Sequence, residues 1–211
     1  MPGPPVDEVR AAADRTLAEL TRLGDAAGLA SAWWVQGWLT WLECRAEDTE
    51  RALATSIDWA RRAGDTRLEA HGVNLYLGAA LFGPMPVEQA VERCLEFRRR
   101  HHDRQRIVAS SVRALAVLRA MQGQFDDARE LVVLDRAILS ELGLRYQTAA
   151  ATEAYGLVEL LAGNPETAER IVRVGYEQLT RMADTNALPT IAALLGEALV
   201  ALERYDEALA V

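Results

Sequence analysis

The most informative stretch of the chain is Gly123-Gln124-Phe125-Asp126-Asp127-Ala128, because its pattern recurs twice. The later copies read Gly163-Asn164-Pro165-Glu166-Thr167-Ala168 and Glu203-Arg204-Tyr205-Asp206-Glu207-Ala208. Their closing alanines stand at positions 128, 168 and 208, so the two steps are equal. Two earlier counterparts, Val87-Glu88-Gln89-Ala90 and Thr49-Glu50-Arg51-Ala52, precede them at slightly shorter steps. A regular period of roughly 40 residues is the signature of a repeat protein.

A second series of turn signals lies between the members of the first. Gly24-Asp25 and Gly64-Asp65 are separated by the same step, and a glycine commonly ends a helix. His102-Asp103, Gly143 and Ala183-Asp184 continue the series at nearly that step. Two turns in each period predict two helices in each repeat.

The segments between these turns have the periodicity of amphipathic helices. After Ser110, helical spacing is kept by the apolar residues Val112, Leu115, Ala116, Leu118 and Met121. We predict an all-α chain of ten or eleven helices, at 6–23, 27–45, 48–63, 66–82, 86–101, 104–122, 125–141, 145–162, 165–181, 187–202 and from 205 onward. Pro86 and Pro165 stand where the first turn of a helix tolerates proline, and Asn164 is the predicted N-cap of the helix that follows it.

The composition excludes several classes of function. Half of the 211 residues are hydrophobic and 26% are charged, which is typical of a folded globular protein. All 23 basic residues are arginine, so the chain has no phosphate-loop, Schiff-base or general-base lysine. The net charge of −8 opposes binding to the phosphates of nucleic acids.

The cysteines and the chain start indicate the compartment. Cys44 and Cys94 are far apart, without a CxxC motif or a Cys/His cluster, so we expect two buried free thiols. Free thiols are compatible with a reducing, cytoplasmic setting. The start Met1-Pro2-Gly3-Pro4-Pro5 does not resemble a signal peptide. No apolar run is long enough to span a membrane, and we predict no membrane partner.

The repeat resembles the tetratricopeptide repeat. That family has Leu-Gly or Leu-Ala in its first helix and begins its second helix with Gly-x-Tyr/Phe-x-x-Ala. The first signature is matched by Leu77-Gly78, Leu115-Ala116, Tyr155-Gly156 and Leu195-Gly196, and the second by Phe125/Ala128 and Tyr205/Ala208. The small residue of the first signature lets two helices cross closely.

This resemblance implies a single domain over residues 1–211. Its fold would be a right-handed superhelical solenoid of tandem antiparallel helix pairs, with about five repeats of roughly 40 residues and the last one truncated. The chain departs from the family at Thr40, where glycine or alanine is expected. Its period also exceeds the family's roughly 34 residues, so longer helices are implied.

A narrower resemblance concerns the run Ala79-Ala80-Leu81-Phe82-Gly83-Pro84-Met85-Pro86-Val87 with Arg93-Cys94 after it. It is similar to the C-terminal repeat region of large actinobacterial signalling proteins. Those proteins join a class III adenylate or guanylate cyclase domain, or a DNA-binding domain, to a regulatory ATPase and then to such repeats. The resemblance implies that this chain is the repeat portion of such a protein.

Candidate binding residues follow from the same family. The first helix of each tetratricopeptide repeat lines an inner groove, and that register implies that Trp34, Trp38, Trp41, Tyr76, Arg113, Glu153 and Glu197 face it. The three tryptophans are spaced i, i+4, i+7 and so share one helix face. They are either an aromatic platform for a peptide or apolar ligand, or core side chains packed against the helix at 6–23.

The stretch Arg98-Arg99-Arg100-His101-His102-Asp103-Arg104-Gln105-Arg106 is locally basic. It is a candidate receiver of an acidic partner, a nucleotide phosphate or a phosphorylated segment. The alternative is a solvated helix end, where cations also suit the helix dipole.

Catalytic patterns are absent from the sequence, since it has no GxSxG, HExxH, GxxxxGK[ST] or GxGxxG motif. We therefore expect no enzyme activity, no cofactor and no metal. The leading hypothesis is a protein interaction or regulatory module that docks a protein or peptide partner, or another domain of its parent chain. The alternative is an effector-binding sensor whose tryptophan-lined groove regulates an attached cyclase, ATPase or DNA-binding domain. A homodimer through exposed repeat ends is a further expectation.

Overall fold

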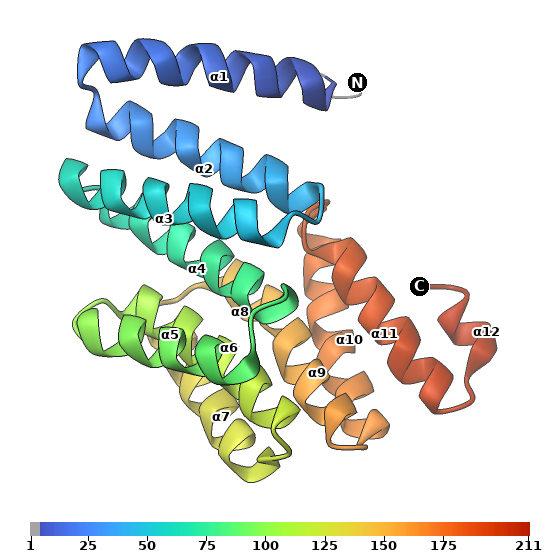
Figure 1. Cartoon of the computed structure of the whole chain (residues 1–211). Helices are drawn as coiled ribbons and strands as arrows, with labels where there is room; N and C mark the ends of the chain where they lie inside the picture. Colours follow the sequence, from blue (N-terminus) through green and yellow to red (C-terminus); the bar gives the residue numbers. More distant parts are fainter. Residues whose placement is uncertain (1–4) are drawn as a thin grey trace. The chain divides into compact units, whose positions relative to one another are not determined.

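The computed structural model describes residues 5–211, and these form helices joined by short turns, without a β-strand (Figure 1). The all-α prediction is therefore confirmed for the described residues. The described residues group into two compact units, the first ending at Ala90 and the second running from Val91 to Val211, with the boundary inside one helix.

In the first unit, each helix packs against the next. Its members are α1 (Val6–Leu23), α2 (Ala26–Leu42), α3 (Ala46–Ala63), α4 (Thr66–Phe82) and the start of α5 (Val87–Arg100). Besides these neighbour contacts from α1 to α4, α2 also contacts α4 directly. Buried side chains such as Leu53 and Val73 lie fully inside this stack.

The second unit continues the pattern. After the rest of α5 it contains α6 (Gln105–Met121), α7 (Phe125–Glu141), α8 (Arg145–Ala150), α9 (Thr152–Leu161), α10 (Pro165–Arg181), α11 (Leu188–Ala201) and α12 (Tyr205–Ala208). Helix α6 contacts α9, and α9 contacts α11, in addition to the contacts between successive helices from α6 to α12. One core cluster joins α8, α10 and α11 and consists of Ala149, Val172, Leu179, Ile191, Leu195 and Leu199.

Left-handed residues mark the turns that the sequence predicted. Gly24, Gly64, Gly123, Gly143 and Gly163 have φ angles between 63° and 76°, where a side chain is strained. The same conformation occurs at Cys44, Ala183 and Glu203, with φ of 58°, 53° and 60°. Through much of the chain, successive turns are therefore separated by about half of the repeat length, as expected for two helices in each repeat.

One predicted helix is interrupted. The segment 145–162 was expected to be continuous, but α8 ends at Ala150 and α9 begins at Thr152. The hydroxyl of Thr152 donates to the carbonyl oxygen of Ala149 at 2.7 Å, and such side-chain bonds to the backbone bend helices. Gly175 of α10 lies against the same point, since a Cβ there would be 2.7 Å from that carbonyl oxygen.

Two helices, α2 and α4, have an aspartate side chain as their N-cap. Asp65 accepts backbone hydrogen bonds from Arg67 and Leu68, at 3.1 and 2.9 Å. Asp25 caps α2 in the same way through Gly28. Asn164 is the N-cap residue of α10, as predicted, but its side chain makes no capping bond. Its amide nitrogen instead donates to Glu159 at 3.1 Å.

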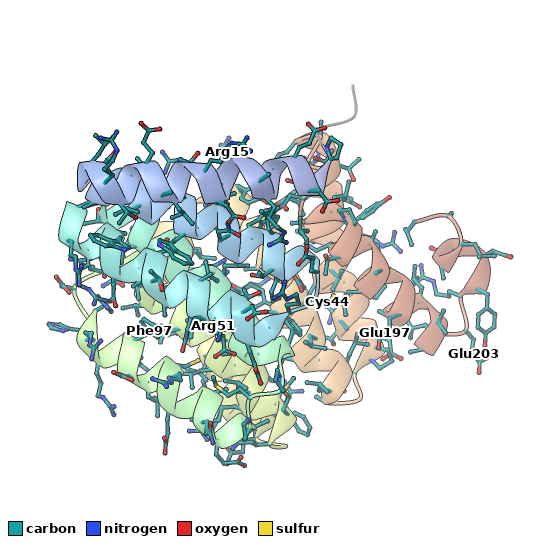
Figure 2. The ribbon with its side chains drawn as sticks, turned by 45° about the horizontal axis from the view of Figure 1, so that its top comes forward. Arg15, Cys44, Arg51, Phe97, Glu197 and Glu203 are labelled. Atoms are coloured by element: carbon teal, nitrogen blue, oxygen red, sulfur yellow. The ribbon has the colours of Figure 1, made fainter. Side chains whose placement is uncertain are left out.

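The two cysteines differ in environment. Cys94 is buried, and this burial raises the pKa of its thiol to about 12. Cys44 is exposed at the turn after α2 (Figure 2), so the expectation of two buried thiols was wrong for Cys44. It occupies a left-handed turn position, which lies at the surface between two helices.

Across residues 5–211, no helix combines the length and the apolar character needed to cross a membrane.

Candidate functional site

The tryptophans of α2 lie half-buried along one side of the helix. The rings of Trp34 and Trp38 are stacked, with centroids 5.9 Å apart and planes 4° from parallel. The indole nitrogen of Trp34 is buried and has no hydrogen-bond acceptor among the described residues. The stack is therefore partly accessible and keeps one unused donor.

Trp41 takes part in packing between helices. It meets Phe82 of α4 edge to face, with centroids 6.4 Å apart and planes at 60°. A Cβ at Gly78 would be 3.8 Å from the Trp41 ring, an ordinary van der Waals distance, so the indole lies close to the α4 backbone here. Trp41 thus helps to join α2 to α4, and it is separate from the stacked pair.

Tyr76 and Glu197, two other candidate groove residues, have contrasting surroundings. Tyr76 is buried in the first unit, with 8% of its surface exposed. Glu197 is exposed on α11 in the second unit (Figure 2). The structure does not bring these two residues together with the tryptophans in one site within either unit.

The second unit contains a charged cluster around Asp135 of α7. The Nε atom of Arg113 donates to Oδ2 of Asp135 at 2.8 Å, and the Tyr155 hydroxyl donates to the same oxygen at 2.7 Å. Asp135 is completely buried, whereas the Arg113 side chain is 17% exposed. One carboxylate therefore holds side chains from both α6 and α9. We call Arg113, Asp135, Glu153 and Tyr155 the polar cluster.

Two features of the polar cluster leave hydrogen-bonding capacity unused. Both bonds to Asp135 reach Oδ2, while Oδ1 is buried without a partner among the described residues. The Nη groups of Arg113 also lack a hydrogen-bond partner within the described part of the chain. Burial opposes the charge of Arg113, but the attraction of Asp135 outweighs it and raises the pKa of the guanidinium. Arg113 is thus a charged group whose outer nitrogens have no partner among the described residues.

Glu153 of α9 completes the polar cluster. Its half-buried carboxyl has a raised pKa, because burial disfavours the charged form more than the attraction of Arg113 favours it. No hydrogen bond ties Glu153 to Arg113 or to any other described residue. The structure therefore brings two of the candidate groove residues, Arg113 and Glu153, within electrostatic reach of each other.

The Glu153→Gln variant is expected to be more stable than the wild type at neutral pH, and this advantage should become smaller at acidic pH. A carboxyl whose pKa is raised on folding loses stability as the pH rises from its unfolded pKa through its folded pKa. Glutamine does not ionise, so the Glu153→Gln variant escapes this loss. Urea unfolding followed by circular dichroism at pH 3.5 and at pH 7 measures the difference (about 3.5 lies below the ordinary pKa of glutamate). An advantage of the variant that is the same at both values would contradict the assignment.

Sequence reasoning missed Asp135, although a signal for it was present. Asp135 follows Ala128 and Val132 at spacings of seven and three residues and precedes Ile138 and Leu139. All four neighbours on this stripe are buried, so the helical period places the carboxylate on the core face. A charge on such a stripe is almost always paired.

A second ionic contact also joins α7 to α9. Arg129 forms a bidentate ion pair with Glu159, with Nε–Oε1 and Nη2–Oε2 distances of 2.9 and 3.0 Å. The hydrogen bond from Arg129 holds the pKa of Glu159 below its usual range. All strong donors and acceptors here are used within the protein, which identifies this contact as structural.

The described residues contain no group of three or more histidine, cysteine, aspartate or glutamate side chains placed to hold a metal ion. The polar cluster also lacks a nucleophile beside a base, because it consists of a guanidinium, two carboxyls and a phenol.

No protein-family model matches the chain, and no curated protein matches it significantly. The function must therefore be inferred from the arrangement of its own residues.

Proposed function

We propose that the chain is a non-catalytic interaction module, a tetratricopeptide-like repeat array that docks a segment of a partner protein. Within each unit, a docking face is formed by the first helices of its repeats: α2 and α4 in the first unit, and α6, α9 and α11 in the second. Support comes from the direct contacts α2–α4, α6–α9 and α9–α11. Contacts between successive first helices are what a stack of helix pairs requires on its inner side.

The observation that carries this proposal is the state of Arg113. Its Nε is fixed by Asp135 at 2.8 Å, and the phenol of Tyr155 holds Asp135 from the other side. The outer nitrogens have no hydrogen-bond partner among the described residues, so a pre-oriented planar fork is left for a ligand to bind. A guanidinium held in this way binds a carboxylate through two parallel hydrogen bonds with little loss of conformational entropy.

Glu153 places a carboxyl group near the guanidinium of Arg113. A half-buried carboxyl without a hydrogen bond costs free energy, and a donor from a ligand removes that cost. A peptide segment offers both groups, since its backbone and side chains carry donors and its acidic residues carry carboxylates. Recognition by such paired groups suits a protein partner better than a chemical substrate.

If the chain is the repeat portion of such a signalling protein, the docked segment would belong to another domain of the same chain. A partner could then be a cyclase, an ATPase or a DNA-binding domain, and docking would regulate it. The exposed apolar side chains of Val200, Tyr205 and Leu209 support the further proposal of self-association through this end of the second unit.

The experiment is a selection of peptides from a random displayed library, followed by affinity measurements with fluorescence anisotropy. The selected peptides are expected to contain acidic residues and to bind the Arg113→Lys variant roughly tenfold more weakly, about 1.4 kcal/mol. Lysine keeps the charge beside Asp135 but removes the fork. Arg145→Lys, at an exposed arginine of α8, is the matched control and should leave affinity unchanged.

Two outcomes would overturn the proposal: no peptide is enriched, or the enriched peptides bind wild type and Arg113→Lys equally. The second candidate function, an effector-binding sensor, is favoured by the stacked Trp34 and Trp38 and by the unused Trp34 donor. A ligand of the sensor would depend on Trp34 and not on Arg113. Binding that is weakened by Trp34→Phe and unaffected by Arg113→Lys would therefore favour the sensor.

A further inference from the structure

A groove lies in the second unit between α5, α6 and α7, away from the polar cluster. One hollow of about 370 Å³ is lined by Leu95, Arg98, Leu115, Arg119, Asp127, Glu130, Leu131 and Leu134. A second hollow of about 460 Å³ is lined by Leu95, Arg98, Arg99, His102 and Val108. The hollows share Leu95 and Arg98, so they are adjacent. We call the two together the α5–α7 groove.

The middle of the α5–α7 groove is apolar. Leu115 of α6 is buried at its base, and Leu95 of α5 and Leu131 of α7 are half-buried above it. Leu134, one turn after Leu131, is 37% exposed. This strip of leucines is left partly open to water, which costs free energy that a docked apolar surface would recover.

The charges at the groove are separated by helix. Arg98 and Arg99 of α5 are exposed, as are Asp127 and Glu130 of α7. Within the described residues none of these four side chains has an ion-pair partner.

Some charges on the same two helices are paired, in contrast to these four. Arg100 pairs with Glu96 at 2.9 Å, and Arg129 pairs with Glu159 at 2.9 Å. Across the α5–α7 groove, the cations of α5 and the anions of α7 remain more than ion-pair distance apart. Each set is therefore available to a molecule that lies between them.

Opposite charges on the two helices restrict the class of occupant. A nucleotide or another phosphate would meet Asp127 and Glu130 as well as the arginines, and like charges repel. An anionic membrane would meet a protein of net charge −8. A helix with an apolar stripe, carboxylates on one flank and cations on the other complements the leucines and both sets of charges at once.

We propose that the α5–α7 groove docks an amphipathic α-helix of a partner protein, with its acidic flank on Arg98 and Arg99 and its basic flank on Asp127 and Glu130. The leucines of the groove take the apolar stripe, whose residues are spaced i, i+4, i+7. This site uses none of the residues of the polar cluster. A failure of one proposal would therefore leave the other unaffected.

Three synthetic helices of about 16 residues test the proposal, since shorter ones are poorly helical in water. All three carry the same leucine stripe. One has a glutamate flank and a lysine flank, the second has glutamate on both flanks, and the third has lysine on both. Anisotropy of a fluorophore on each peptide gives its affinity for the whole chain. Wild type is expected to bind the mixed peptide roughly 3- to 10-fold more tightly than the other two.

Charge reversal in the protein should then change the preference. The Arg98→Glu, Arg99→Glu double variant is expected to bind the all-lysine peptide best, and the Asp127→Arg, Glu130→Arg double variant the all-glutamate peptide. All four side chains are exposed, so the variants should fold, and circular dichroism checks this. Arg145→Glu, an exposed arginine outside the groove, is the control and should keep the wild-type order.

Three results would overturn the proposal. The first is an identical peptide preference in all the variants, and the second is no binding of the mixed peptide to wild type at millimolar concentration. The third is displacement of the mixed peptide by inorganic phosphate at constant ionic strength, because this would identify an anion site formed by the arginines alone.

Discussion

Replacing Asp135 by alanine is expected to lower the free energy of unfolding by about 3–5 kcal/mol, the usual cost of removing one partner of a buried ion pair. The carboxylate is fully buried and is the acceptor for both Arg113 and Tyr155. Without it, a guanidinium that is only 17% exposed keeps its charge in a poorly solvated place. The Tyr155 hydroxyl loses its acceptor at the same time.

Urea unfolding followed by circular dichroism measures this loss. Glu130→Ala is the matched control, because Glu130 is an exposed carboxylate on the same helix without an ion pair among the described residues, and surface substitutions of this kind change stability by about 0.5 kcal/mol or less. Adding Arg113→Met to Asp135→Ala should recover part of the loss by removing the uncompensated cation. If Asp135→Ala costs no more than Glu130→Ala, Asp135 does not hold the polar cluster together.

Replacing Gly175 by alanine is expected to cost about 3 kcal/mol, at the upper end of the usual range for overpacking. The added Cβ would lie 1.8 Å from the Thr152 hydroxyl oxygen and 2.7 Å from the carbonyl oxygen of Ala149. The carbonyl is backbone and cannot rotate away. Helix α10 must therefore move away from α8 and α9, and buried contacts such as those of Val172 and Ala149 are lost.

Thermal unfolding checks this expectation, with a decrease in Tm of roughly 6–12 °C for a chain of this size. Gly196→Ala is the matched control in α11, since the nearest atom to its added Cβ would be 3.9 Å away. That change should stabilise the protein by about 0.5–1 kcal/mol, because alanine is the better helix former. Equal effects of the two substitutions would show that α10 does not approach α8 closely at Gly175.

Local signals explain why the helices were predictable. Gly64, Gly123 and Gly163 adopt a left-handed conformation that most other residues disfavour. Each of them therefore ends a helix through its own backbone preference, without help from tertiary contacts. Pro165 likewise begins α10, as its fixed φ angle favours. The interruption at Ala151 was not predictable, since it depends on Thr152 bonding to Ala149 and on the approach of Gly175 from another helix.

The candidate site was predictable only in part. Arg113 and Glu153 were selected from their register on the first helices, and they do interact. Asp135, which organises both α6 and α9, was overlooked because a single aspartate between Leu134 and Arg136 resembles a solvated charge. Tyr76 shares the register of the groove candidates but is buried, since the packing of its neighbours decides how much surface remains.

The all-helical class, the regular turns and nearly every helix end could be derived from the amino-acid sequence, because they depend on backbone preferences within a few residues. Which charges pair with each other, in contrast, could be learned only from the folded structure. Asp135 meets Arg113 and Tyr155, while Arg98 and Glu130 have no ion-pair partner among the described residues. The reason is that ion pairing depends on distances between helices far apart in the chain, and side-chain packing sets those distances.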